Sequence, residues 1–558
     1  MPKTRKIFRW VLYFIGTILL LCLGLFIYVS IVSKTEPPLI TNRAADTWQR
    51  EDKGEGFYTL KNSWFRKSKS GLYEMYVEGN PYEMGVINGK LSKELVVNQE
   101  IYFNEQISKM IPSKSYLHFL KYFVGWFNRH LDKNVSDEYR KEIYGVSQSA
   151  SGDFGYIGTP YQRILNYHAA HDIGHALQSM ALVGCTSFGT WDNLSADGTM
   201  IIGRNFDFYV GDKFATDKIV AFYHPSTGNR FMTVTWGGFI GAVSGMNEKG
   251  LTVTINAAKT AIPSGAETPV SLVAREILQY AGNIEEAKKI AASRKMFVSE
   301  SFLVASAADH KAVVIEKTPE AMDVYDPGKD YIVCANHFQG SSLVNTVENQ
   351  EQIHESASEY RYKRLQQLLD SNGKNTVEKT IGILRDQKGI NNRNIGMGNE
   401  KAINQLIAHH SIVFEPEKRL VWVSTSPWQL GEYVAYDLNK VFGLAGKSSN
   451  EEISDSSLRV PADSFLQTKS FADFERFRSY RKRILDHQPV NADSIVASNP
   501  EYYHAWVLAG DESFRKEDYQ KAMQFYAKAL TKEIATKKEY DYIHGQMEKT
   551  GRKIEKSL

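Results

Sequence analysis

The hydrophobic pattern of the chain changes near residue 185. Residues 71–184 are mostly helical in pattern and include aromatic-rich stretches such as 116–127. After residue 185, short apolar runs alternate with turns that contain Gly, Asn and Asp, a pattern typical of β-strands. The predicted strands are 200–206, 219–223, 231–236, 251–257, 302–306, 312–316, 331–335, 411–414 and 420–424.

Helices interrupt this series of strands. Thr268 and Pro269 fit an N-cap followed by Pro at the first helical position, so a helix is expected to run to Tyr280. A second helix is expected near 284–292, and a third over 361–369. Antiparallel strands, a helix pair and further strands predict an α+β fold, with two antiparallel sheets between two helix layers.

The N-terminal segment predicts a membrane anchor. Residues 10–33 carry no charge, and four basic residues precede them: Lys3, Arg5, Lys6 and Arg9. The run is long enough to span a bilayer, and its basic flank should stay in the cytoplasm. The rest of the chain would then face the periplasm or the cell exterior. A removed signal peptide is the alternative. Residues 1–33 are thus an expected anchor, and the polar residues 34–70 an expected linker.

The C-terminal region, 446–558, is predicted to begin with a polar linker and continue as helices. The spacing of six residues matches one tetratricopeptide-type repeat: Trp506, Gly510, Tyr519, Ala522, Tyr526 and Ala529. One repeat cannot bury its own apolar face, so we expect a helical hairpin packed on the catalytic body. An independent module that binds a protein partner is the alternative.

Composition narrows the possible functions. The 558 residues are 42% hydrophobic and carry a net charge of +3, which gives no indication of nucleic-acid binding. With only three cysteines, Cys22, Cys185 and Cys334, a disulfide framework is not expected. A Cys185–Cys334 bridge is conceivable, but it would block the candidate chemistry at Cys185.

Cys185 is the main candidate for that chemistry. It follows Gly184 and opens a strand, and Arg204 and Asp207 return on the next one. Cleavage of the Gly184–Cys185 bond would leave a thiol and a free α-amine on one residue. Such an amine titrates at about 7.7–8.0, which suits a general base at neutral pH. Taken alone, however, Cys185 fits a small buried hydrophobic residue better.

Several segments together resemble the penicillin acyltransferase (acyl-coenzyme A:6-aminopenicillanic acid acyltransferase) family of N-terminal nucleophile hydrolases, to which choloylglycine hydrolases are more distantly related. The resemblance implies the αββα fold, a helical pro-segment over 71–184, self-cleavage before Cys185 and a catalytic domain over 185–445. The similar segments are 77–85 with Gly89, 184–186, 203–207, 245–251 leading to Asn256, 335–337 and 358–365.

The resemblance also implies roles for individual residues. Asp207 would orient the new α-amine, and Arg204 would line the pocket beside the thiolate. Asn256 would donate a hydrogen bond to the developing oxyanion, as an Asn in such a segment does in choloylglycine hydrolases. Asn336 would position the nucleophile or the substrate carbonyl. Arg361 would close the site electrostatically.

Each role has a structural alternative. Asp207 and Arg204 are also compatible with a salt bridge to each other, and Asn256 with a satisfied strand end. Arg364, one turn after Arg361, is a second candidate, and an exposed helix face is the alternative for both. His337 is expected to be structural. A metal site is the less favoured interpretation of the three histidines that share one helical face, His168, His171 and His175.

The sequence therefore predicts a self-cleaving cysteine amide hydrolase or acyltransferase that needs no cofactor. Its substrate would be a small, linear N-acyl amide, and it would react through an acyl-Cys185 intermediate. A choloylglycine-type hydrolase of bile salts or acyl-homoserine lactones, or a lipid amidase, is the alternative enzyme. An inactive envelope scaffold is the alternative without activity.

Overall fold

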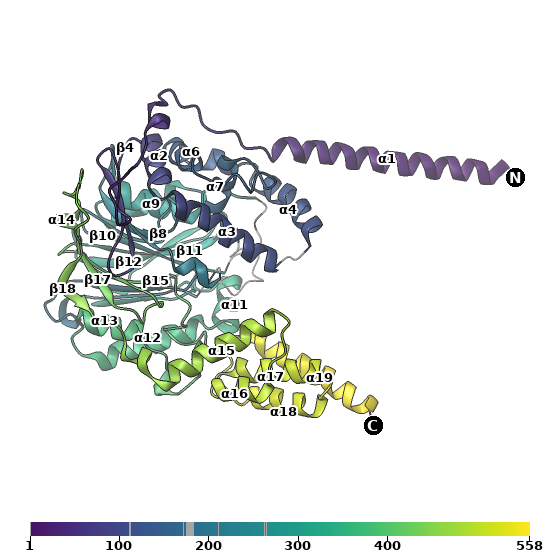
Figure 1. Cartoon of the computed structure of the whole chain (residues 1–558). Helices are drawn as coiled ribbons and strands as arrows, with labels where there is room; N and C mark the ends of the chain where they lie inside the picture. Colours follow the sequence, from purple (N-terminus) through teal and green to yellow (C-terminus); the bar gives the residue numbers. More distant parts are fainter. Residues whose placement is uncertain are drawn as a thin grey trace.

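Two stacked sheets form the centre of the molecule, and helices cover both outer faces (Figure 1). The computed structural model describes residues 2–110, 113–170, 172–173, 184–209, 211–259, 261, 263 and 265–557. Within these residues, one sheet has 11 strands in the order β1-β2-β3-β4-β7-β8-β9-β10-β11-β12-β13, and the other has seven in the order β14-β5-β6-β15-β16-β17-β18. Neighbouring strands pair antiparallel except β4 and β7, which are parallel. The predicted αββα architecture is confirmed.

The strands of the larger sheet are β1 (Glu51–Asp52), β2 (Tyr58–Leu60), β3 (Ser63–Lys67), β4 (Tyr73–Gly79), β7 (Ile219–Pro225), β8 (Phe231–Thr235), β9 (Ser244–Asn247), β10 (Leu251–Ala258), β11 (Ser299–Ser306), β12 (Lys311–Lys317) and β13 (Met322–Tyr325). Those of the smaller sheet are β5 (Thr186–Thr190), β6 (Ile201–Phe206), β14 (Tyr331–Cys334), β15 (His410–Glu415), β16 (Leu420–Ser424), β17 (Tyr433–Asp437) and β18 (Asp455–Val460). All nine predicted strands are therefore present.

The helices on the larger sheet's side are α2 (Pro81–Leu91), α3 (Lys93–Met110), α4 (Lys114–Phe127), α5 (Leu131–Asn134), α6 (Asp137–Ser147), α7 (Pro160–His168), α9 (Val270–Tyr280) and α10 (Ile284–Ser293). The other helices of the body are α11 (Val347–Glu355), α12 (Ser358–Asn372), α13 (Val377–Leu384) and α14 (Leu438–Val441). The three helices predicted after residue 185 correspond to α9, α10 and α12.

Three layers of apolar side chains hold this arrangement together. Ile255 and Phe302 belong to the layer between the larger sheet and its helices. Phe222 and Ile412 meet in the layer between the sheets. A third layer joins the smaller sheet to α12 and α13. Because both faces of each sheet are covered, the strands are apolar on both sides, and this is why they appear in the sequence as continuous hydrophobic runs.

The expected linker over 34–70 is wrong. It contains β2 and β3, and the expected helical segment 71–184 begins with β4, which pairs along its whole length with β7. Trp64 and Tyr76 are fully buried and stack on each other at 6.1 Å between ring centroids. Their apolar surface belongs to the layer between the sheets, so this edge of the larger sheet is built from residues that precede Cys185. The polar segment from residue 446 likewise ends in β18.

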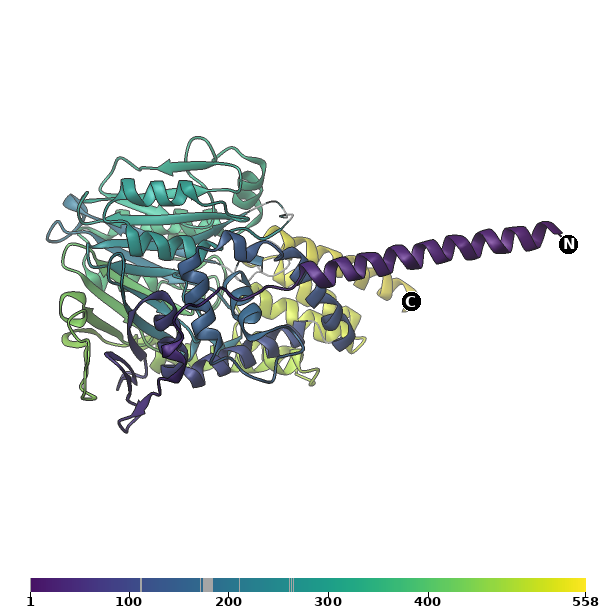
Figure 2. The same cartoon turned by 90° about the horizontal axis from the view of Figure 1, so that it is seen from above.

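The N-terminal helix α1 (Pro2–Val32) projects from the body in both views (Figures 1 and 2). The stretch Lys6–Val32 is long and apolar enough to cross a membrane, and both a membrane anchor and a signal sequence have these properties. The C-terminal end of α1 touches the body. There Phe26 packs on Tyr122 of α4, and Ser33 accepts a hydrogen bond from Gln162 through its backbone oxygen.

The C-terminal helices are α15 (Lys469–Leu485), α16 (Ala492–Ser498), α17 (Tyr503–Arg515), α18 (Tyr519–Ala529) and α19 (Lys537–Ser557). The expected hairpin is formed by α17 and α18, where the Tyr526 ring packs against Gly510. Leu406 and Leu430 of the body share one apolar cluster with these helices. The hairpin is therefore packed on the body, as expected.

Helices α2 and α6 pack so closely that glycine is required at their contact. A Cβ atom on Gly85 would collide with the backbone oxygen of Glu142, and one on Gly145 would lie 2.6 Å from the backbone oxygen of Tyr82. We expect Gly85→Ala to lower the free energy of unfolding by about 1–3 kcal/mol, because two backbones would have to separate. Gly382→Ala is the control, because Gly382 is an exposed position of α13 and nothing lies within 4 Å of a Cβ atom added there. Helix propensity predicts that it is neutral or stabilises by up to about 1 kcal/mol. Thermal unfolding of both variants measures this, and equal melting temperatures would contradict the requirement.

Candidate active site

The Gly184–Cys185 peptide lies at the end of β5, in the interior of the protein. Cys185 is fully buried, and the strand that it opens pairs with β6 on one side and β14 on the other. The backbone N–H of Gly184 donates to the backbone oxygen of Asp207 at 2.9 Å. The peptide is thereby tied to the segment that follows β6, which brings the residues predicted from two separate motifs together.

Arg204 is the buried positive charge of this site. Its guanidinium donates to the backbone oxygens of Val243 at 2.9 Å and Ile255 at 2.5 Å, and to the hydroxyl of Ser244. It also lies 3.5 Å from the sulfur of Cys185. The guanidinium is therefore held by the backbone of the larger sheet and directed at the thiol. Across the described residues it forms no ion pair with Asp207, the alternative considered from sequence.

Asp207 is fully buried beside the same peptide. One of its carboxylate oxygens accepts a hydrogen bond of 3.3 Å from the side-chain amide of Gln405, and the other has no partner among the described residues. Burial raises the pKa of Asp207 to about 7, against the opposing charges of Arg361 and Arg204. This carboxyl can therefore take up or release a proton near neutral pH.

Gln405 is a site residue that the sequence motifs do not identify. Its amide nitrogen donates to the backbone oxygen of Gly184 at 2.9 Å as well as to Asp207. It lies in the loop between α13 and β15, outside every motif that carries the family resemblance. Only its position in the last polar turn before a predicted strand could have drawn attention to it.

Asn256, on β10, joins the two sheets. Its side-chain oxygen accepts from the hydroxyl of Ser187 at 2.7 Å, and its amide nitrogen donates to the backbone oxygens of Cys334 and Ala335, both at 3.1 Å. Both amide hydrogens are therefore engaged in the uncleaved chain.

Asn336 and Arg361 form the other wall of the site. The Asn336 amide nitrogen donates to the backbone oxygen of Ala257 at 2.8 Å, and its oxygen accepts from the guanidinium of Arg361 at 2.5 Å. Arg361 also donates to the backbone oxygen of Glu400 at 2.8 Å. Its charge acts on both Asp207 and Cys185, so this arginine belongs to the same cluster.

The remaining candidates have structural partners. Arg364 forms a bidentate ion pair with Asp386, at 2.8 and 3.0 Å. His337 shares a hydrogen bond of 2.8 Å with the hydroxyl of Ser358. His168 uses both ring nitrogens, one toward the backbone oxygen of Ile164 and one accepting from the backbone N–H of Ile240. His171 and His175 lie outside the described residues, and the described part of the chain contains no group of three metal-ligating side chains.

Burial keeps the Cys185 thiol protonated. Burial raises its pKa to about 11, although Arg204 acts in the opposite direction. Cys334 is also a free thiol, and burial raises its pKa well above the ordinary value. Glu300 is fully buried nearby, and neither of its oxygens has a hydrogen-bond partner in the described structure. Burial and the charge of Asp172 raise its pKa well above the ordinary range, so Glu300 is a neutral acid.

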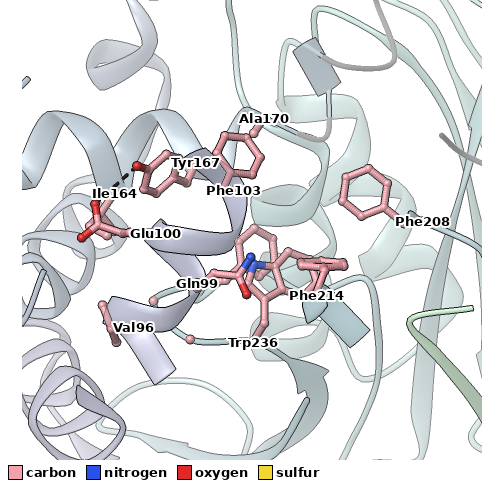
Figure 3. A pocket seen from close by; sticks show the side chains of 13 residues that line it. Val96, Gln99, Glu100, Phe103, Ile164, Tyr167, Ala170, Phe208, Phe214 and Trp236 are labelled. Atoms are coloured by element: carbon pink, nitrogen blue, oxygen red, sulfur yellow. Dashed lines mark hydrogen bonds between the residues drawn. The ribbon is translucent and has the colours of Figure 1, made fainter. Parts of the chain in front are cut away.

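Phe208, the residue after Asp207, lines an aromatic cavity of about 30 Å³ (Figure 3). Phe208, Phe214 and Trp236 form much of its wall, and Gln99 and Glu100 contribute polar groups at its rim. The Phe208 ring stacks on Phe206 at 5.6 Å between centroids. The guanidinium of Arg204 lies 4.3 Å from the centre of that Phe206 ring. A continuous apolar wall thus leads from the buried guanidinium to the cavity, which in this form holds little more than one water molecule.

The two stacked sheets between helix layers define the class of fold as αββα, and the buried Cys-Arg-Asp cluster lies at the end of β5 and β6. Residues 194–426 match the family model described as acyl-coenzyme A:6-aminopenicillanic acid acyl-transferase. This match confirms, over those residues, the family resemblance that the motifs predict, and with it a relationship to enzymes that act on or form amide bonds.

Two curated relatives match about half of the chain. A protein of Archaeoglobus fulgidus described as uncharacterized is 26% identical over 347 residues, which covers 56% of this chain and 57% of that one. Protein dcd1B of Dictyostelium discoideum is 24% identical over 271 residues, covering 45% and 51%. The chain thus spans little more than half the length of these relatives.

Solved structures of low overall similarity include an N-acylethanolamine-hydrolyzing acid amidase ortholog of Caenorhabditis elegans, with 19% identity over 42% of this chain and 93% of that one, and a TM-score of 0.30. A penicillin V acylase of Agrobacterium tumefaciens has 12% identity over 48% and 89%, with a TM-score of 0.31. A conjugated bile acid hydrolase of Clostridium perfringens has 14% identity over 46% and 93%, with a TM-score of 0.30. The fold assignment rests on the chain's own sheets and helix layers.

The high pKa of the buried thiol leads to a test of its reactivity. In chains that still contain the Gly184–Cys185 bond, we expect alkylation of Cys185 to accelerate about tenfold per pH unit up to pH 10, because only the thiolate reacts. Mass spectrometry of a peptide that spans both residues reports on uncleaved chains alone. In the denatured chain the rate should level off above the ordinary thiol pKa of about 8.5. A plateau below pH 9 in the folded chain would show that the thiolate is stabilised there.

Proposed function

We propose that this protein is a membrane-anchored, self-processing cysteine amide hydrolase. In this proposal Cys185 attacks the carbonyl carbon of Gly184, and the resulting thioester is opened by water to free the N-terminus of Cys185. The observation that carries the proposal is a buried Cys185 thiol that adjoins the Gly184–Cys185 bond and lies 3.5 Å from the Arg204 guanidinium, while the N–H of Gly184 donates to the Asp207 backbone oxygen at 2.9 Å.

The same cluster supports the subsequent reaction. The freed α-amine would replace the Gly184 nitrogen beside Asp207, where a carboxylate can hold it in position. The amine would accept the thiol proton while the sulfur attacks a substrate amide. Asn256 and Asn336 would donate to the substrate oxygen once the departing segment releases the site. Water as the second substrate gives hydrolysis, and an amine would give acyl transfer.

The aromatic cavity supports an apolar acyl group. Phe208 follows Asp207 directly in sequence, and the wall continues through Phe214 and Trp236. Withdrawal of the new C-terminus at Gly184 from the site would let this apolar lining receive an acyl chain. We therefore propose linear N-acyl amides as substrates, with bile-salt-type amides and lipid amides as narrower alternatives.

The N-terminal helix supports a membrane location. Basic residues precede its apolar stretch, and this arrangement favours a cytoplasmic N-terminus. The catalytic domain would then lie in the periplasm or outside the cell. Intracellular acyl-coenzyme A would be a poor acyl donor there, which favours hydrolysis over transfer from that donor.

Self-processing can be tested by intact-mass analysis of the full chain in detergent. We expect a wild-type fragment that begins at Cys185, and only full-length chain for Cys185→Ala, because the alanine has no nucleophile. Cys334→Ala is the matched control, since it removes a second buried thiol and should still be cleaved. If wild-type chain stays intact, autocatalytic maturation is excluded and the scaffold interpretation is favoured.

Amide hydrolysis can be tested on the processed protein. Incubation with N-acyl amino acids of increasing acyl length should release free amine, and Cys185→Ala protein should release none. Longer acyl chains should be preferred because the cavity lining is aromatic. Equal rates of amine release at all acyl lengths would contradict the role assigned to the cavity.

The part of the chain before Cys185 should remain bound after cleavage. It supplies β1 to β4, and β4 pairs with β7 over seven residues, so its loss would expose the buried faces of Trp64, Met75 and Tyr76. We expect both fragments to co-elute in size-exclusion chromatography in detergent and to separate only in denaturant. Separation under native conditions would contradict this prediction.

A further inference from the structure

We infer that Gln405 is a catalytic residue of the maturation step, and that its side-chain amide is the oxyanion donor for cleavage of the Gly184–Cys185 bond. The inference rests on the proposed self-processing. It adds a residue that lies in none of the motifs and that touches the reacting carbonyl directly.

The geometry fits such a donor. The Gln405 amide nitrogen lies 2.9 Å from the Gly184 backbone oxygen, within the 2.7–3.1 Å expected for an oxyanion-hole contact. Gln405 is only 3% exposed, so water does not compete for the carbonyl. The approach is close, because a Cβ atom on residue 184 would lie 2.6 Å from the Gln405 amide nitrogen and would displace that side chain.

The other amide donors of the site are engaged elsewhere in the uncleaved chain. Asn256 donates to the backbone oxygens of Cys334 and Ala335, and Asn336 donates to the backbone oxygen of Ala257. The guanidinium of Arg204 is directed at the thiol and at backbone carbonyls. Among the described residues, Gln405 is the side chain that donates a hydrogen bond to the Gly184 oxygen itself.

The C-terminal helices brace the loop that carries Gln405. Asn499 exchanges two hydrogen bonds with the backbone of Met397, at 3.1 and 2.8 Å. Asn399 donates to the backbone oxygen of Glu533 at 2.8 Å, and Lys401 pairs with the Glu533 carboxylate at 2.7 Å. These contacts fix the loop on both sides of Glu400, so Gln405 enters the site on a supported segment.

The maturation step conserves atoms and charge. The Cys185 sulfur bonds to the Gly184 carbonyl carbon, and the negative charge that develops on the oxygen is held by the Gln405 amide. The carbon–nitrogen bond then breaks, and the proton lost by the thiol ends on the Cys185 nitrogen, with the Asp207 carboxylate as a carrier of suitable pKa near 7. Water hydrolyses the thioester, which restores the thiol and leaves a carboxyl group on Gly184.

The test follows the cleavage rate of pulse-labelled full-length chain in lipid vesicles. We expect Gln405→Leu to slow formation of the Cys185 fragment about 100-fold or more, because one oxyanion donor contributes about 10²–10³ in rate. Gln405→Glu keeps the size of the side chain but replaces the donor with an acceptor beside Asp207, and should be slowed as strongly. If Gln405→Leu does not fold, the cleavage rate of Gln405→Glu tests the assignment instead.

Gln429→Leu is the matched control. Gln429 is another fully buried glutamine, and its side-chain amide has no hydrogen-bond partner in the described structure, so its replacement should leave the cleavage rate within about twofold of wild type. Thermal unfolding of the uncleaved chains checks that each variant is folded. A folded Gln405→Leu or Gln405→Glu chain that matures at the wild-type rate would overturn the assignment while leaving self-processing intact. Failure of the wild-type chain to mature would overturn both.

Discussion

A buried guanidinium determines how the site is organised. Arg204 has no exposed surface, and placing a charge in such an interior is costly unless hydrogen bonds replace its hydration. The replacement comes from the backbone oxygens of Val243, just before β9, and of Ile255 on β10 of the larger sheet, while Arg204 itself lies on β6 of the smaller sheet. One side chain thus joins both sheets and fixes the position of the Cys185 thiol between them. The acidic groups around it, Asp207 and Glu300, have raised pKa values because burial outweighs the opposing charge of Arg204 and, at Asp207, that of Arg361 as well.

The order of folding and cleavage follows from the sheet topology. The strands before Cys185 form one edge of the larger sheet, and β4 is held against β7, which comes after it. The cleavage site is therefore assembled from both sides of the bond that would be cut. A fragment that began at Cys185 would lack four strands of the sheet, so the fold has to form while the chain is continuous. The proposed self-cleavage would therefore come after folding, and the N-terminal segment has a structural function as one edge of the larger sheet.

Much of this arrangement could be predicted from the sequence. Strands after residue 185 were predictable because both their faces are apolar, and the clustering of Cys185, Arg204 and Asp207 followed from adjacent strands. The expectation of a linker over 34–70 is wrong. Its strands β2 and β3 are short and flanked by charged residues, so the local pattern resembles a linker. Their burial comes from distant contacts, such as the hydrogen bond from Trp64 to the backbone oxygen of Leu444. Gln405 could not be predicted, because a long loop braced by C-terminal helices brings it to the site. Local patterns contain little information about such tertiary contacts.

The thiol pKa explains why carbonyl stabilisation matters so much in the uncleaved chain. With a pKa of about 11, only about one thiol in 10⁴ is ionised at pH 7, a deficit of about 5 kcal/mol relative to a fully ionised nucleophile. An oxyanion donor contributes about 3–4 kcal/mol, which offsets most of that deficit without requiring a stable thiolate. After cleavage the balance would change, because an α-amine with an ordinary pKa of about 7.7–8.0 would stand beside the sulfur as a proton acceptor. The uncleaved site therefore depends on holding the carbonyl, and the cleaved site on removing the proton.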